Sequence, residues 1–168
     1  TMYHPVYPSP AISNNADAVY SENLRLLGHD FSLINNTLAI TTHWRVEYQI
    51  RTMLHQFYAF LNKGLDLELN KRLHEPYHIF LHLLNMKSGN LAYGFDELMH
   101  NEGGLPANQW RDGETVTMNH ILTLSELPPG TYQLGIGIYD FESGKRLQIT
   151  EGTSIGDDWL HLQEFALP

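Results

Sequence analysis

Cysteine is absent from the 168-residue chain, which excludes disulfide scaffolds, thiolate metal sites and cysteine nucleophiles together. Basic residues are scarce, because 10 Lys and Arg stand against 19 Asp and Glu, for a formal net charge of -9. This balance argues against binding to phosphate backbones or anionic lipid, since both need a surplus of Lys and Arg. No apolar run approaches the roughly 20 residues that a membrane span needs. We therefore expect no nucleic-acid partner and no membrane span in this chain.

The chain is long enough for one domain with a single hydrophobic core, and 42% of its residues are hydrophobic. Residues 1–23 differ from the rest, because Pro5, Pro8 and Pro10 interrupt regular structure there. We interpret 1–23 as an extended lead-in or linker, and 24–168 as the domain.

Short apolar segments separated by turn residues fill most of that domain. They predict eight strands, at 24–33, 38–46, 77–86, 91–95, 115–124, 131–140, 146–150 and 159–167. Asn35 and Asn36 predict a tight connection between the first two strands. Strands at this spacing are typical of an antiparallel sandwich. The expected fold class is all-β, an immunoglobulin-like or jelly-roll-like sandwich of about eight strands.

One segment departs from this pattern. Apolar residues between 48 and 62 recur at separations of 3 and 1, at Ile50, Met53, Leu54, Phe57, Tyr58 and Leu61. A strand needs period two, so the pattern predicts an amphipathic helix, inserted at about 47–76 across one face or end of the sandwich. The alternative is a surface helix that touches a membrane or a partner, although its polar face lacks the expected Lys and Arg.

The sequence LPPGTY at 127–132 predicts a structured corner. Its prolines end one strand, and Tyr132 then occupies the place of a tyrosine corner, whose hydroxyl binds the corner backbone. Alternation puts Tyr132 on the inner face of the next strand and Gly135 and Gly137 on its outer face. Without side chains, these glycines admit either a neighbouring side chain or a ligand, and we favour the side chain.

Six motifs follow one another in a fixed order. They are LLGHD at 26–30, Trp44 at a strand end, FLHLL at 80–84, WRDGE at 110–114, LPPGTY at 127–132, and GIYD at 137–140 followed by Gly144 and Arg146-Leu147. In this order they resemble the extracytoplasmic C-terminal β-sandwich domain of bacterial membrane glycosyltransferases similar to dolichyl-phosphate-mannose-protein mannosyltransferases, and of related uncharacterised proteins.

The resemblance implies an extracytoplasmic location, periplasmic or at the cell surface, with tethering to a membrane through a parent protein. A complete chain would instead be expected in the cytoplasm. The insertion at about 47–76 departs from the family pattern, in which the Trp strand leads through a short link to the Phe-His strand. The catalytic acids of such transferases lie in their membrane portion, so the resemblance implies no catalytic residue here.

The spacing of the histidines does not predict a metal site. His74, His78 and His82 recur every four residues, which would form one face of a helix. Pro76 and the following aromatic and β-branched residues predict a strand instead, on which His78 and His82 are about 13 Å apart, too far for one ion. The acidic pairs at predicted turns, Asp96-Glu97, Asp140 with Glu142, and Asp157-Asp158, have no EF-hand spacing. We predict no metal site and no cofactor.

Carbohydrate is the ligand that the sequence favours. Sugars stack on flat aromatic rings while side-chain amides and carboxylates bind their hydroxyls. Two groups have this makeup: Trp110 with Asn108, Gln109 and Arg111, and Tyr93 with Asp96. The alternative is that Trp110 plugs one end of the sandwich, with Arg111 and Glu114 paired at the rim.

Two functions of different classes remain open. The first is a non-catalytic accessory or binding module that contacts carbohydrate, an acceptor or the membrane portion of a parent protein. The second is a self-standing sugar-active or metal-dependent enzyme whose site is completed by the 47–76 insertion. We expect the first, and so no catalytic residue in this chain.

Overall fold

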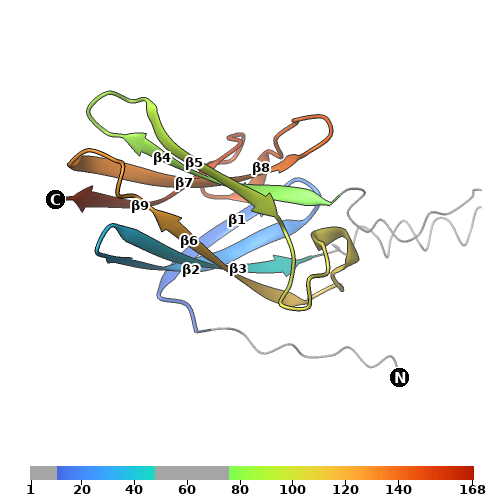
Figure 1. Cartoon of the computed structure of the whole chain (residues 1–168). Coiled ribbons are helices and arrows are strands. Elements are labelled where there is room, and N and C mark those ends of the chain that lie inside the picture. The colour runs from blue at the N-terminus through green and yellow to red at the C-terminus, as the bar shows by residue number, and fades with distance from the viewer. Residues whose placement is uncertain (1–10, 48–75) are drawn as a thin grey trace, which may run out of the picture.

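The computed structural model describes residues 11–47 and 76–168. Within them nine strands form two antiparallel sheets that pack together, which confirms the all-β sandwich (Figure 1). One sheet has the order β6-β3-β2-β1-β8 and the other β5-β4-β7-β9. The strands are β1 Asn14–Tyr20, β2 Leu24–Ile34, β3 Thr37–Val46, β4 Tyr77–Asn85, β5 Leu91–Leu98, β6 Thr115–Thr123, β7 Gly130–Asp140, β8 Ile149–Gly152 and β9 Leu160–Leu167.

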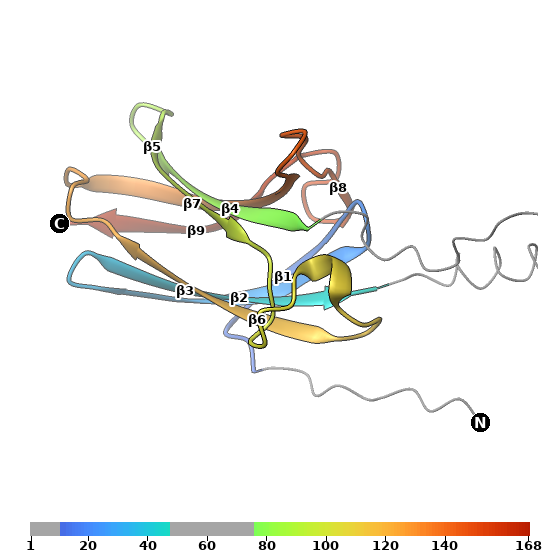
Figure 2. The same ribbon diagram turned by 45° about the vertical axis from the view of Figure 1, so that its right-hand side comes forward.

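The two layers are separate in Figure 2, with β4, β5, β7 and β9 on one side and β2, β3 and β6 on the other. Their inner faces meet in one core that includes Trp44, Leu81 and Ile136. Alternation along each strand decides which residues enter it, because successive side chains point to opposite faces. A short 3-10 helix, η1 Ala107–Gln109, lies between β5 and β6. No helix in the described part of the chain is long and apolar enough to cross a bilayer.

The first strand corrects one prediction. Residues 14–20 were expected within a lead-in or linker, and they form β1, paired with both β2 and β8. Ala18, Val19 and Tyr20 are buried, and the Tyr20 hydroxyl donates to the carbonyl of Ile136 in the other sheet at 3.0 Å. The domain therefore begins before residue 24. The last three residues of β1 are buried one after another, so the strand lacks a clear alternation of apolar and polar residues. The prolines at 5, 8 and 10 therefore favoured the prediction of a linker.

All eight predicted strands have counterparts in the structure. The last but one begins later than expected, at Ile149, and Arg146 forms only an isolated bridge to Tyr139. Asn35 and Asn36 make the predicted tight turn, both with positive φ, 47° and 59°, as a hairpin with right-handed twist requires. The helix expected at about 47–76 falls on residues 48–75 almost entirely, outside the described residues.

The corner predicted from LPPGTY is also present. The Tyr132 hydroxyl donates to the carbonyl of Pro128 at 2.7 Å, four residues upstream, and its ring is buried. This bond confirms the tyrosine corner, and it fixes where β7 enters the sheet. The residues of β7 that follow are therefore held in register with β4 on one side and β9 on the other.

Candidate functional site

The outer face of the four-stranded sheet gathers aromatic and histidine side chains. On β4, Ile79, Leu81 and Leu83 point into the core, so His78, Phe80 and His82 point outward. The β7 residues in register with them are Tyr139, Gly137 and Gly135, which lie on the same face. We call this surface the aromatic face; its members are His78, Phe80, His82, Tyr139, Phe141, Trp159 and His161.

Two glycines of β7 shape the aromatic face. A Cβ on Gly137 would lie 2.1 Å from Cζ of Phe80, and one on Gly135 would lie 2.0 Å from Cε3 and Cζ3 of Trp159. Both rings therefore rest directly on the strand backbone, where any larger residue would push them away. This confirms that the glycines admit neighbouring side chains. It also leaves Trp159 half-buried, with its six-membered ring on Gly135.

Ring contacts link most of these side chains into a band, and Trp159 pairs separately with His161. His78 stacks on Phe141 with ring centroids 4.7 Å apart, and Phe80 contacts His82 at 4.5 Å. The Trp159 indole meets His161 edge-on at 4.5 Å. Phe141 is 65% exposed, whereas Phe80 is buried beneath its neighbours. The face thus offers half-exposed rings above a buried aromatic base.

Charged groups lie at the edges of this band. The Arg146 guanidinium carbon is 4.5 Å from the centre of the Phe80 ring, and its Nη1 is 3.4 Å from the Asp158 carboxylate. Asp96 on β5 is the register partner of Phe80, and its side chain is exposed. A guanidinium over an aromatic ring is attracted by the ring's quadrupole. The aromatic face therefore carries one cation and two carboxylates.

Two polar side chains of the aromatic face, His82 and Tyr139, have pKa values shifted from their ordinary values. Burial lowers the pKa of His82, and the positive charge of Arg146 lowers it further, against the opposing effect of Asp96 and Asp158. Burial and the charge of Asp96 raise the pKa of Tyr139. At neutral pH the imidazole is therefore uncharged and can donate and accept one hydrogen bond each, while the phenol keeps its proton.

The residues that the sequence proposed for ligand binding do not come together. Asp96 lies on the aromatic face. Tyr93 points to the inner side of the sheet instead, because it is the register partner of the core residue Leu83. Its ring packs against the core. Of this pair, only Asp96 faces solvent beside other candidate ligand groups.

In the other proposed group, Trp110 is a core residue, as the alternative interpretation of this group has it. It is 2% exposed, belongs to the core, and donates its indole N–H to the carbonyl of Leu105 at 2.9 Å. Its ring therefore has no free face on which a sugar could stack. Asn108 is partly buried, while Gln109 and Arg111 are exposed beside it. The Arg111 backbone N–H donates to the Glu114 carboxylate at 2.7 Å, so these two residues close a tight loop next to the buried indole.

The residues that sequence reasoning missed are Trp159, Tyr139 and Arg146. The alternation of β4 could have indicated this face, because it places His78, Phe80 and His82 on the outer side of the sheet. Glycines of β7 are the register partners of Phe80 and His82. Which aromatic residue would fill the space above those glycines depends on the register of β9, which the sequence pattern does not fix.

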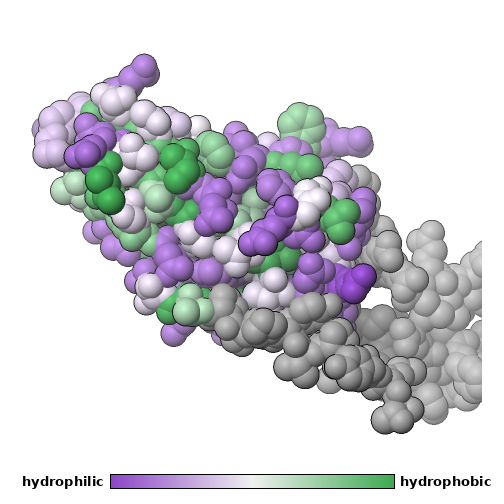
Figure 3. Space-filling view, turned by 60° about the horizontal axis from the view of Figure 1, so that its bottom comes forward, coloured by the Kyte–Doolittle hydropathy of each residue, from purple (hydrophilic) through white to green (hydrophobic). Residues whose placement is uncertain are grey.

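The opposite side of the sandwich is different in character. In Figure 3, the side of the molecule on which β2 and β3 lie shows mostly hydrophilic side chains, with hydrophobic ones in separate small patches. Ile121 and Ile34 are exposed there singly, which is ordinary for a folded protein. The aromatic face has no counterpart among the described residues of that sheet.

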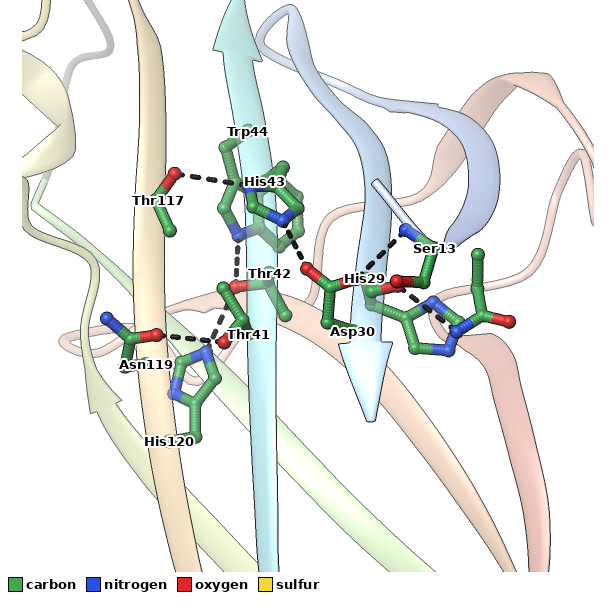
Figure 4. Close-up of polar contacts among 11 residues, drawn as sticks. Ser13, His29, Asp30, Thr41, Thr42, His43, Trp44, Thr117, Asn119 and His120 are labelled. Atoms are coloured by element: carbon green, nitrogen blue, oxygen red, sulfur yellow. Dashed lines mark hydrogen bonds and ion pairs between the residues drawn. The ribbon is translucent and has the colours of Figure 1, made fainter. Parts of the chain in front are cut away.

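Histidines of the five-stranded sheet form two carboxylate–imidazole–hydroxyl chains. Figure 4 shows the first chain, through His43, and the contact of His120 with Thr42 in the second. In the first, His43 Nε2 is 2.9 Å from Asp30 and its Nδ1 is 3.1 Å from the Thr117 hydroxyl, across three neighbouring strands. The Ser13 backbone N–H donates to the other oxygen of Asp30 at 2.9 Å. His43 is buried, so this chain fixes strand packing and offers no open imidazole.

The second chain lies between the two sheets. His120 Nδ1 contacts the Glu97 carboxylate of β5, and Nε2 is 3.0 Å from the Thr42 hydroxyl, which in turn accepts the Trp44 indole N–H at 2.9 Å. The Nδ1–H tautomer satisfies all four groups, with Thr42 donating to Nε2. His120 and Thr42 are fully buried. No ligand can reach them, so the geometry of a hydrolytic triad here serves structure.

Removal of the Asp30 charge is expected to change the acid stability. Its hydrogen bonds to His43 and Ser13 lower the pKa of Asp30 to about 2. These hydrogen bonds to the ionised carboxylate therefore stabilise the fold fully above the unfolded pKa of about 3.9, and this contribution is lost as pH falls toward 2. Because Asp30 is 34% exposed, we expect Asp30→Asn to cost about 1 kcal/mol at pH 7.

Urea unfolding of both proteins between pH 7 and pH 2 measures this effect. The gap in unfolding free energy between wild type and Asp30→Asn is expected to close as pH falls below about 4. A gap that stays constant over the whole range would contradict it.

The remaining carboxylate clusters have structural partners or face solvent. Asp140 accepts the Ser143 hydroxyl at 2.6 Å and the Glu142 backbone N–H at 3.0 Å, and the Ser143 hydrogen bond lowers its pKa. Asp157 is exposed. Within residues 11–47 and 76–168, no group of three or more His, Asp or Glu is placed to hold a metal ion.

Comparison with known proteins gives no relative for this chain. No family model, curated protein or solved structure matches it. The geometry of the aromatic face is therefore the basis for any functional conclusion.

Proposed function

We propose that this protein is a non-catalytic carbohydrate-binding module and that it binds sugar on the aromatic face. The observation that carries the proposal is the half-buried Trp159 ring seated on Gly135, with polar groups on the same surface. A ring held against the backbone loses little freedom when a sugar stacks on it, so less entropy opposes binding.

The groups around Trp159 suit the edges of a sugar. Hydroxyl groups of a carbohydrate act as donors and acceptors at once, and the neutral His82 imidazole can serve both roles. The Asp96 carboxylate accepts, and Arg146 only donates. Few polar groups that converge beside an aromatic surface are the usual makeup of a specific small-ligand site.

The wider setting is also a proposal. The resemblance of the six sequence motifs supports an extracytoplasmic accessory domain of a membrane glycosyltransferase-like parent, whose membrane portion would be a second partner. The sandwich fold and the Tyr132 corner are compatible with such a domain. Sequencing the gene on both sides of this segment tests the setting: hydrophobic spans upstream are expected, and a gene without any would contradict it.

Replacement of Trp159 by alanine tests the binding site. A glycan array identifies sugars that bind the wild-type protein, and calorimetric titration with the strongest of them is repeated on Trp159→Ala. Loss of a stacked aromatic contact is expected to weaken binding about tenfold or more.

Ile121→Ala is the matched control, because Ile121 is 61% exposed on the other sheet. It should bind sugar as the wild type does. Sugar binding that Trp159→Ala leaves unchanged would move the site elsewhere, and a wild-type protein that binds no glycan would exclude the proposed function. The enzyme alternative depends on the 47–76 insertion, and no contact of the described residues favours it.

A further inference from the structure

A groove adjoins the aromatic face at one end of the sandwich. It is formed by the turn after β1 and by the segment between β7 and β9, and it is lined by Ser21, Gly144, Lys145, Arg146, Gln148, Thr150 and Asp158. Arg146 belongs to both surfaces, because its guanidinium also lies over Phe80. A ligand on the aromatic face can therefore extend into the groove past Arg146.

The groove lining is positively charged, whereas the protein as a whole is acidic. The chain has a net charge of -9, yet two adjacent basic residues, Lys145 and Arg146, meet a single carboxylate, Asp158, in the lining. Arg25 shows the contrast, since it is neutralised by Asp17, Glu47 and Glu151. Within this lining two cations face one carboxylate, and the unbalanced positive charge attracts an anion that enters the groove.

The Arg146 side chain is held with part of its hydrogen-bonding capacity unused. Its Nη1 contacts Asp158 at 3.4 Å, the long limit of a hydrogen bond, and its guanidinium carbon lies 4.5 Å from the centre of the Phe80 ring. Its Nε and Nη2 have no partner within the described residues. A planar guanidinium fixed in this way presents paired N–H donors that match the two oxygens of a carboxylate or sulfate.

Lys145 is placed by the turn that precedes it. Its backbone N–H donates to the Ser143 hydroxyl at 3.2 Å, and its carbonyl accepts the Asp140 N–H at 2.9 Å. The ammonium group has no partner among the described residues, and Lys145 lines the same groove as Arg146. Ser21, Gln148 and Thr150 add neutral groups suited to sugar hydroxyls.

We propose that the carbohydrate bound by this protein is acidic, with its anionic substituent, a uronate carboxylate or a sulfate ester, bound by Arg146 and Lys145 in the groove. This inference rests on the proposed function, since the sugar ring itself would stack on the aromatic face. Asp158 keeps Arg146 in position and leaves the free edge of the guanidinium for the ligand.

Three oligosaccharides of equal length test the inference: an oligogalacturonate, the neutral oligosaccharide obtained by reduction of its carboxyl groups, and a sulfated galacto-oligosaccharide. Titrations use the wild type, Arg146→Gln, Lys145→Gln and the control Arg111→Gln, whose side chain is exposed at a different place. The wild type is expected to bind at least one anionic oligosaccharide about tenfold or more tightly than the neutral one.

Arg146→Gln is expected to remove most of that preference, and Lys145→Gln part of it, while Arg111→Gln keeps it. The anionic compound that shows the preference identifies the substituent. Thermal unfolding of each variant separates loss of binding from loss of fold, and Lys145→Gln still tests the inference if Arg146→Gln unfolds. Equal binding of the anionic and neutral compounds would overturn the acidic ligand and leave the carbohydrate module standing; no binding of any oligosaccharide here or on the array would count against the module itself.

Discussion

Gly152→Ala is expected to lower the free energy of unfolding by about 4 kcal/mol, since strain and overpacking each cost a few kcal/mol. Gly152 has a φ of 93° and is the register partner of Ala18 where β8 joins β1. A Cβ there would lie 1.9 Å from the carbonyl oxygen of Asp17 and 2.8 Å from its carbonyl carbon. Both atoms are backbone, so no side-chain rotation relieves the clash, and β1 and β8 must separate.

Gly144→Ala is the matched control for this change. Gly144 also has a positive φ, 67°, but a Cβ there would meet nothing within 4 Å. Its replacement therefore measures backbone strain alone, expected to cost about 1 kcal/mol. Urea unfolding at neutral pH measures both variants. If Gly152→Ala costs no more than Gly144→Ala, the predicted clash between the new Cβ and the Asp17 backbone does not lower the stability, and the prediction is wrong.

His120→Leu is expected to cost about 3 kcal/mol of stability, although leucine is similar in size and apolar. The imidazole links Glu97 of one sheet to Thr42 of the other, and both His120 and Thr42 are fully buried. Without the ring nitrogens, the Thr42 hydroxyl loses its acceptor in the core. Glu97, which is partly exposed, can turn to water, so Thr42 bears most of the cost.

A double-mutant cycle with Thr42→Val isolates the polar part of this cost. Once valine has removed the hydroxyl, His120→Leu should cost about 1 to 2 kcal/mol less than it does in the wild type. His161→Leu, at an exposed histidine, is the control and should change stability by less than about 0.5 kcal/mol. Additive effects of the two core substitutions would show that the hydrogen bond between them contributes nothing.

Local signals predicted most of the fold. Asn35 and Asn36 specify their hairpin turn because few residues accept positive φ, and the Pro128-Pro129-Gly130 corner specifies where β7 starts. The strand β1 escaped prediction for a non-local reason: its burial depends on Tyr20 reaching across to Ile136, 116 residues later. Composition upstream could not indicate that contact.

The candidate site was predictable only in part. Asp96 was named, and the pairing of Gly135 and Gly137 with a close neighbour was anticipated, but the neighbours were not. Trp110 has polar residues on both sides, as a surface aromatic does, yet its indole finds a backbone acceptor at Leu105 and a place in the core. Burial of a tryptophan needs one such acceptor, and a sequence pattern does not reveal it.

The sequence by itself determined that this chain is a β-sandwich with a tyrosine corner, because period-two alternation and turn chemistry act between near neighbours. The tertiary structure alone decided which tryptophan is buried and which lies on the surface. Trp110 is buried, and Trp159 lies on the surface because β9 pairs with β7 in a register that seats its ring on Gly135. That register is set by packing across the whole sheet, where contacts far apart in sequence determine the free energy.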